Sequence, residues 1–286
     1  MKAARIHRHG DPSVIQIDDV PIPVPGPGEV LVKVAATSFN PTEIAVRRGI
    51  LGPMDLPYTL GWDVAGTANG EPVFGWLDGG AAADYVVAPR SRLVSPPSSI
   101  PLVTAAAIPL AGLTAWQAVI PNVAKGQRVF INGAGGGIGG FAVQLAKYVG
   151  AHVIATASPR SHETIRRYGA DEIVDYTTGA RLDDPVDVMI HLVGTPPPWI
   201  PPVGTIISAA APVAAPPGVP SSHMVTQYDT GQLTSLAQLI DAGELVVDAV
   251  THPLDDIAEV HRRGEAGDIR GKITITAAGD TLRLRG

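Results

Sequence analysis

Arg128-Val-Phe-Ile-Asn132 leads directly into Gly133-Ala-Gly-Gly-Gly-Ile-Gly-Gly140, and this stretch decides the fold. Its first half is a short apolar run typical of a buried strand, and the chain continues as a helix over 141–148. A tight turn from strand to helix needs residues that tolerate positive φ, and glycine also lets the backbone approach a pyrophosphate. The helix N-terminus supplies N–H groups for the phosphates. We therefore predict a nucleotide-binding loop rather than a merely tight turn, with the glycine registers 133/136/139 and 135/137/140 both open.

Strands and helices alternate after this loop. Further apolar runs occur at 152–156, 171–175, 187–191 and 204–208, with a helical stretch at 163–168. Such alternation argues for a parallel sheet covered by helices. Residues 1 to about 115 instead hold short strand candidates among frequent turn residues, which suggests a small barrel or sandwich. A last strand at 271–276 has no place in the parallel sheet, so we expect it to return to the first domain.

The end of the second strand of this unit indicates which nucleotide binds. A unit that binds NAD places an Asp or Glu there to hold the ribose hydroxyls. Here the chain reads Thr156-Ala-Ser-Pro-Arg160, and no acid appears before Glu163. Ser158 can hydrogen-bond a 2′-phosphate and Arg160 can pair with it, so we expect NADPH. The alternatives are a solvated arginine after a turn, or a methyltransferase that uses S-adenosylmethionine, which would also want an acid at this point.

Composition excludes several classes of protein. Apolar residues make up 45 % of the 286 residues and charged residues 17 %, as in an ordinary globular protein, and the net charge is −6. No basic run indicates a nucleic-acid or membrane partner, and no apolar run reaches the ~18 residues of a membrane span. The N-terminus lacks the apolar core of a signal peptide, so we expect a cytoplasmic location. The chain has no cysteine, which excludes disulfides, thiolate nucleophiles and cysteine-ligated zinc.

Several segments resemble the quinone oxidoreductase branch of the medium-chain dehydrogenase/reductase superfamily. They follow the family's order over nearly the whole chain: Gly28-Glu-Val-Leu-Val-Lys-Val34, Ser38-Phe-Asn40-Pro41, Leu60-Gly-Trp-Asp-Val-Ala-Gly66, 106–117, the glycine loop, 168–176 and the tail from His252 to Ile273. The resemblance implies an α/β fold with two domains and a homodimer. The first is a GroES-like β-rich catalytic domain formed by 1–115 and completed by 248–286. The second is a Rossmann domain, a doubly wound parallel sheet over 116–247 that binds NADPH.

The resemblance also implies roles for individual residues. Asn40 occupies the position of an asparagine near the nicotinamide and the acceptor, and Tyr176 matches a tyrosine near the 2′-phosphate. Leu192 and Val193 follow the fourth strand of the sheet, where the chain lines the cofactor cleft. The family's cofactor-contacting positions fall on Asn40, Thr114, Gly136, Gly137, Ile138, Ser158, Arg160, Tyr176, Leu192, Val193 and Ser208.

Zinc-dependent relatives place a cysteine in the first catalytic segment and Gly-His-Glu in the second. The corresponding segments here read Asn40-Pro-Thr-Glu43 and Gly61-Trp-Asp63, so we expect no catalytic metal. The structural-zinc lobe is missing too. Zinc serves alcohol dehydrogenases as a Lewis acid on the alcohol oxygen. Its loss points to hydride transfer from NADPH to a quinone or to an α,β-unsaturated carbonyl compound.

Such a reaction needs a donor for the developing oxyanion, although a quinone can take its protons from water. Asn40 and Tyr58 are our candidates, against a turn-forming Asn-Pro and a packing tyrosine. Glu43 and Asp63 are candidates to line the site. The alternative for Asp63 is a buried structural carboxylate that accepts backbone N–H groups. His191, at the end of a strand, is a further candidate to border the cofactor. No Ser/His/Asp spacing supports a hydrolase.

Other functions remain open on the same fold. One is an enoyl-thioester reductase or tailoring enzyme of secondary metabolism, and another is a non-catalytic NADPH-binding sensor or structural protein. Two departures from the family pattern bear on the substrate. Residues 67–75 look compressed, and the region 196–220 is rich in proline.

Overall fold

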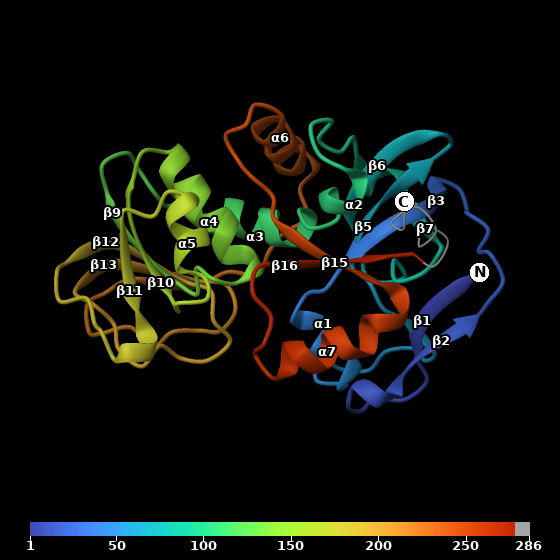
Figure 1. Cartoon of the computed structure of the whole chain (residues 1–286), viewed down its shortest axis with the longest axis horizontal. Coiled ribbons are helices and arrows are strands. Elements are labelled where there is room, and N and C mark those ends of the chain that lie inside the picture. The colour runs from blue at the N-terminus through green and yellow to red at the C-terminus, as the bar shows by residue number, and fades with distance from the viewer. Residues whose placement is uncertain (278–286) are drawn as a thin grey trace. The chain divides into compact units, whose positions relative to one another are not determined.

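The computed structural model describes residues 1–277, which divide into two compact units (Figure 1). Unit 1 holds residues 1–110, 228–241 and the described residues from 247 onward, and unit 2 holds 111–227 and 242–246. The domain boundaries expected at 115/116 and 247/248 stay a prediction. The units assign 228–241, which we expected in the nucleotide-binding domain, to unit 1.

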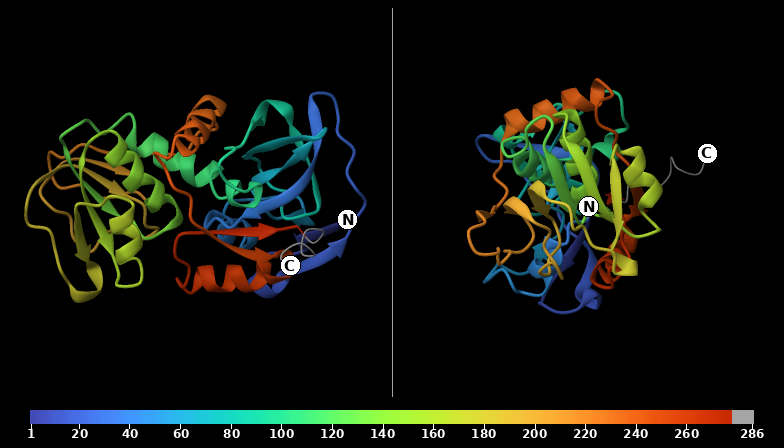
Figure 2. Two further views of the ribbon diagram at one scale, coloured as in Figure 1. Left: turned by 45° about the horizontal axis from the view of Figure 1, so that its top comes forward. Right: turned by 90° about the vertical axis from the view of Figure 1, so that its left-hand side faces the viewer.

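Unit 2 is built on a parallel sheet, as the alternating pattern predicts. Within the described residues its order is β11-β10-β9-β12-β13-β14, and every pair is parallel. The strands are β9 (Arg128–Asn132), β10 (His152–Ala157), β11 (Glu172–Asp175), β12 (Val186–His191), β13 (Val203–Ser208) and β14 (Ser221–His223). The helices are α3 (Pro109–Val119), α4 (Gly137–Tyr148) and α5 (His162–Arg167). Helices α4 and α5 lie against β9 and β10 (Figures 1 and 2).

The proline-rich region packs against this sheet. The described chain forms no helix between β12 and β14, and loops fill that place instead. Trp199 packs with its ring centroid 5.3 Å from that of Phe130 on the central strand β9. Val213 joins the same buried apolar cluster. Irregular segments thus cover part of the sheet surface that a crossover helix covers in a regular doubly wound sheet.

Unit 1 contains two sheets. The smaller has the order β2-β1-β4, from β1 (Lys2–Ile6), β2 (Ile15–Asp19) and β4 (Tyr58–Thr59). The larger has the order β15-β16-β3-β5-β6-β8, with β7 also paired to β3. Its strands are β3 (Glu29–Ser38), β5 (Asp63–Ala68), β6 (Glu71–Trp76), β7 (Tyr85–Pro89), β8 (Leu93–Val94), β15 (Ala249–Pro253) and β16 (Lys272–Thr276). The helices are α1 (Thr42–Arg47), α2 (Leu102–Ala105), α6 (Thr230–Asp241) and α7 (Ile257–Glu265).

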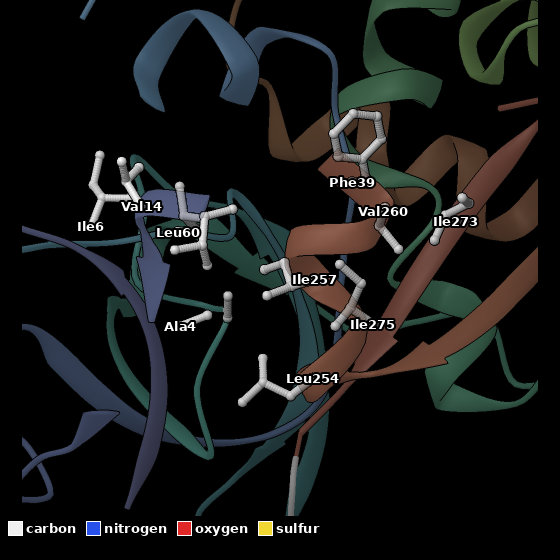
Figure 3. Close-up of a cluster of buried hydrophobic side chains, with 12 residues drawn as sticks. Ala4, Ile6, Val14, Phe39, Leu60, Leu254, Ile257, Val260, Ile273 and Ile275 are labelled. Atoms are coloured by element: carbon white, nitrogen blue, oxygen red, sulfur yellow. The ribbon is translucent and has the colours of Figure 1, made fainter. Parts of the chain in front are cut away.

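The C-terminal strand closes the larger sheet. Strand β16 runs antiparallel to β3, with Thr274 opposite Ser38, and parallel to β15. Figure 3 shows side chains of β16 and α7, such as Ile275 and Ile257, in one apolar cluster with Ile6 of β1. Burying these side chains ties the two ends of the chain together, because apolar area removed from water stabilises the folded state by about 25 cal/mol per Å².

The segment that looks compressed in the sequence is a tight hairpin. Strands β5 and β6 pair from Ala68 opposite Glu71, so only Asn69 and Gly70 form the turn. Both have positive φ, 53° and 85°. Asn-Gly is the preferred pair for a two-residue turn of this kind, because both positions require left-handed backbone. Separately, no helix within residues 1–277 has the length and apolar character that a membrane span requires.

Candidate active site

The glycine loop of unit 2 uses the first of the two registers that the sequence leaves open. Gly133 has φ +96°, and a Cβ there would lie 2.8 Å from Cγ2 of Val193. A Cβ at Gly139 would lie 2.5 Å from the Cα of Ala134, which is backbone and cannot move aside. A Cβ at Gly140, in the second register, would meet only the edge of the Tyr168 ring. The turn therefore requires glycine at 133 and 139.

The N-terminus of α4 is open to an anion. Gly136 is its N-cap and offers no side-chain cap to the first turn. The first N–H groups of a helix have no intrahelical acceptor and carry a partial positive charge. Gly137 and Ile138 are the first two residues of this helix. The N–H groups of Gly137 and Ile138 thus suit a phosphate, whereas the Gly136 N–H donates to the Gly133 carbonyl oxygen at 3.1 Å.

A series of hydrogen bonds from Thr156 through Asn132 to His191 supports the glycine loop. The Gly133 N–H donates to Oγ1 of Thr156 at 2.9 Å, and this hydroxyl lies 3.2 Å from Oδ1 of Asn132. Nδ2 of Asn132 lies 2.9 Å from Nδ1 of His191, whose Nε2 lies 3.0 Å from the Thr195 carbonyl oxygen. These partners fit a neutral imidazole that accepts at Nδ1 and donates at Nε2. Burial also lowers the pKa of His191. His191 therefore supports the glycine loop through its hydrogen bond with Asn132.

Two of the predicted phosphate ligands follow β10. Ser158 is buried at 4 % exposure, and its hydroxyl is buried without a hydrogen-bond partner in the described chain. An unpaired buried hydroxyl is costly unless a ligand completes it. Arg160 is exposed. Tyr176, also exposed, directly follows β11, whose last residue pairs with the last residue of β10. All three therefore lie at the carboxyl edge of the sheet.

The other predicted cofactor residues of unit 2 are placed differently. Leu192 and Val193 follow β12 beside the loop, and the Leu192 N–H donates to Asn132 O at 2.9 Å. Ser208 is fully buried at the end of β13, where its hydroxyl lies 3.0 Å from Nδ1 of His223 on β14. Thr114, on α3, is buried with its hydroxyl 2.8 Å from that of Thr226. Ser208 and Thr114 thus already have protein partners.

Unit 1 contains a second set of functional groups, which we name the Asn40 cluster. Its members are all at most 5 % exposed and come from β3, the loop that follows it, α1, β5 and β16: Ser38, Asn40, Glu43, Asp63 and Lys272. Nδ2 of Asn40 donates to Oδ2 of Asp63 at 2.9 Å, and Nζ of Lys272 donates to Oδ1 of Asn40 at 2.9 Å. Lys272 also forms an ion pair with Asp63 at 3.6 Å.

Carboxylates in this cluster are held by backbone and hydroxyl donors. Oδ1 of Asp63 accepts the Leu110 N–H at 2.8 Å, and Oδ2 accepts the hydroxyl of Ser38. Oε1 of Glu43 accepts the Gly61 N–H at 2.7 Å, and Oε2 accepts the Asn40 N–H at 3.1 Å. Asp63 is thus the structural carboxylate that the sequence suggests, and it also fixes Asn40.

Burial also changes the charge balance of the cluster. It raises the pKa of Glu43 to about 7, with the nearby Asp63 adding to the rise and the two backbone donors opposing it. Burial lowers the pKa of Lys272, whereas the carboxylates of Asp63 and Glu43 oppose that change. A carboxyl group that titrates near neutral pH lies next to an ion pair, an arrangement typical of functional sites.

Tyr58, the second predicted catalytic residue, has structural partners. Its hydroxyl donates to Asp78 O at 2.7 Å and accepts from Nε1 of Trp62 at 3.0 Å. Burial raises its pKa to about 12. A phenol whose proton is engaged and held this tightly is a poor proton donor, so the geometry favours Asn40.

Sequence reasoning missed Lys272 and Ser38 as parts of this site. No local signal marks either residue: Lys272 stands in an ordinary strand, 232 positions from Asn40. In the described chain, no group of three or more His, Cys, Asp and Glu side chains could hold a metal ion.

Comparison with known proteins relates this geometry to a family. Two family profiles match: the alcohol dehydrogenase GroES-like domain over residues 26–70 and the zinc-binding dehydrogenase domain over 168–275. The solved quinone oxidoreductase of Coxiella burnetii is 27% identical, with 97% of this chain and 99% of that chain covered and a TM-score of 0.85. The matched domains and the solved neighbour make the chain similar to the medium-chain dehydrogenase/reductase family. The resemblance seen in the sequence and the expected α/β fold are thereby confirmed.

Curated relatives carry several names. The chloroplast envelope quinone oxidoreductase homolog of Arabidopsis thaliana is 35% identical over 202 residues, which cover 60% of this chain and 61% of that protein. A trans-enoyl reductase of Aspergillus terreus is 32% identical over 228 residues, which cover 68% of this chain and 61% of that protein. The chain thus spans about three fifths of the length of these relatives. The roles of individual residues stay predictions.

Proposed function

We propose that this chain is an NADPH-dependent reductase that transfers hydride to a quinone or an α,β-unsaturated carbonyl compound without a metal. The observation that carries the proposal is the buried, partnerless hydroxyl of Ser158 at the end of β10, two residues before the exposed Arg160. Both follow a strand adjacent to the glycine loop, where a dinucleotide's adenosine ribose binds in a Rossmann unit.

The choice of NADPH over NADH rests on what the end of β10 offers. Ser158 and Arg160 are a hydroxyl donor and a guanidinium, the groups that bind a phosphate. An acid that would hold an unmodified ribose, or the ribose of S-adenosylmethionine, is missing between 156 and 162. Tyr176, at the end of the neighbouring strand, is exposed and available to pack against the adenosine end.

Each unit has a defined task in this proposal. The backbone N–H groups of Gly137 and Ile138, after the N-cap Gly136, bind the pyrophosphate, and Leu192 and Val193 flank the loop. NADPH, when bound, supplies the hydride. Asn40 binds the carbonyl oxygen of the acceptor through its side-chain amide and stabilises the negative charge that develops there. Protons reach the product from water, since Tyr58 is engaged elsewhere.

Independence of metal is part of the proposal. The segment matched by the zinc-binding dehydrogenase profile contains no cysteine, like the rest of the chain. Asn40 and Trp62 stand where zinc-dependent relatives have ligands, and neither residue type suits catalytic zinc. The homodimer and the cytoplasmic location stay predictions.

A second candidate is reduction of an enoyl thioester, which the likeness to a trans-enoyl reductase favours. The cofactor and the role of Asn40 are the same for both acceptors, because each reaction produces an enolate-type oxyanion. Rates on quinones, simple enones and enoyl thioesters separate the two. A protein that binds NADPH but turns over none of them would be a sensor or structural protein, and the reductase proposal would be wrong.

Paired titrations with NADPH and NADH, followed by nicotinamide fluorescence, test the cofactor. Replacing Arg160→Ala removes a charge-assisted contact, so we expect NADPH affinity to fall by about tenfold to a hundredfold and NADH affinity to change less than about twofold. The matched control is Arg128→Ala, at the start of β9 on the opposite edge of the same sheet. Equal losses for both cofactors with Arg160→Ala would refute the 2′-phosphate assignment.

A further inference from the structure

The Asn40 side chain sits between a group that can only donate and a group that can only accept. We propose that Lys272 and Asp63 are positioning residues, which fix the orientation of the Asn40 amide so that one of its N–H bonds is kept for the acceptor. This inference rests on the proposed role of Asn40 and extends it to residues outside direct contact with the acceptor.

The chemistry of the two neighbours sets the orientation of the amide. An ammonium group has donors and no acceptor, so the Asn40 atom 2.9 Å from Nζ of Lys272 must be the carbonyl oxygen. An ionised carboxylate only accepts, so the atom 2.9 Å from Oδ2 of Asp63 must be the amide nitrogen. A flipped amide would oppose donor to donor and acceptor to acceptor. The network thus resolves an ambiguity that an isolated asparagine leaves open.

Counting donors shows what remains for a ligand. Nζ of Lys272 has three N–H bonds and three acceptors: Ser38 Oγ at 2.7 Å, Asn40 Oδ1 at 2.9 Å and Phe39 O at 3.2 Å. The hydroxyl of Ser38 accepts from Lys272 and donates to Asp63. The amide nitrogen of Asn40 has two N–H bonds, and residues 1–277 supply an acceptor for one. The second is the donor left over.

Sheet register brings Lys272 to this place. Strand β16 pairs antiparallel with β3, Thr274 opposite Ser38, and the Phe39 N–H continues the ladder to Ile273 O. Lys272 is the first residue of β16, two positions before Thr274, and Asn40 lies two positions beyond the end of β3, so the same register brings the two residues together. A slip of one residue would turn the lysine to the other face of the sheet. The C-terminal strand therefore serves the site as well as the fold.

Stability alone is a weak reason to keep such a network. Buried ion pairs often contribute little net stability, because desolvation of both charges offsets their attraction. Here the charged groups of Lys272 and Asp63 contact the Asn40 amide, which the proposed reaction uses. The ion pair therefore serves the reaction and not stability alone. Glu43 completes the arrangement from the backbone side, where its Oε2 accepts the Asn40 N–H.

A double-mutant cycle on kcat tests the proposal. We expect Asn40→Ala to lower kcat about a hundredfold, and Lys272→Met to lower it about tenfold to a hundredfold while the NADPH dissociation constant changes less than about twofold. Because Lys272 acts through Asn40, the double variant should match Asn40→Ala within about twofold. Losses that multiply would overturn the proposal. The matched control is Lys147→Met, which removes a lysine paired with Asp171 at 2.7 Å in unit 2.

Two further measurements keep the test decisive. Should Lys272→Met fail to fold, the pair Lys272→Met with Asp63→Asn leaves no unpaired buried charge, and unchanged kcat in that variant would overturn the proposal. Side-chain amide NMR of Asn40, assigned with Asn40→Ala, needs no activity. We expect two well-separated proton shifts in the wild type that converge in Lys272→Met; identical spectra would refute the orientation. Absence of turnover in the wild type would refute the proposed function alone.

Discussion

The carboxyl group of Glu43 gives the sharpest quantitative prediction. In the folded protein burial raises its pKa from 4.5 to about 7. That difference of about 2.5 corresponds to about 3 kcal/mol at 1.36 kcal/mol per pKa unit. Because the folded state holds the proton more tightly than the unfolded chain, stability from this group is greatest below pH 4.5. It falls as the pH rises and levels off above about pH 7.

Replacing Glu43→Gln removes the titration. Both carboxylate oxygens accept backbone N–H bonds, so the variant loses one acceptor at a pH-independent cost of about 1–3 kcal/mol. The free energy of unfolding of the variant relative to wild type should then rise by about 2.5 kcal/mol between about pH 5 and about pH 8. Urea denaturation followed by tryptophan fluorescence measures it, since Trp62 and Trp76 lie in unit 1.

A matched control is Glu163→Gln, at the exposed start of α5. Its unfolding free energy should run parallel to that of wild type across the whole range. The reasoning is refuted when the curve for Glu43→Gln also runs parallel to wild type. That result would mean that Glu43 is ionised in the folded protein well below neutral pH, and that its backbone donors outweigh burial.

Two further substitutions test the loop and the tyrosine. Gly139→Ala brings a Cβ to 2.5 Å from the Cα of Ala134, so we expect a thermal midpoint lower by several degrees and weaker NADPH binding; wild-type values of both would contradict the glycine register. Tyr58→Phe removes a hydroxyl with two protein partners, so we expect a loss of about 1 kcal/mol in unfolding free energy and kcat within about twofold of wild type. A large fall in kcat at unchanged stability would restore Tyr58 as a proton donor.

Features carried by contiguous residues are predictable from the sequence. The strand, the glycine loop and helix α4 follow one another over 128–148 in the predicted order, although α4 begins at Gly137, four residues before the predicted start at 141. The same holds for the parallel sheet and for the return of the last strand to the first unit. Each of these features depends on the backbone preferences or the apolar periodicity of neighbouring residues, and both can be recognised in the sequence.

The proline-rich region shows where local reasoning stops. Its prolines indicate loops, and loops are present, but nothing in their pattern predicts that Trp199 packs against Phe130. The short strand β14, which directly follows this region, was also missed, since its three residues are all polar and exposed. Packing of irregular segments depends on the shape of the surface they meet, and that surface forms only when the sheet does.

The sequence by itself determined the resemblance to the family, the α/β fold class, the loop at 133–140 and the residues Ser158 and Arg160 at the end of β10. Only the tertiary structure decided which glycine register the turn uses, that Tyr58 is engaged, and that Lys272 joins Asn40 and Asp63. The physical reason is that these outcomes depend on strand register and close approach between residues up to 232 positions apart. A hydrogen bond over that separation costs chain entropy that only the whole fold repays.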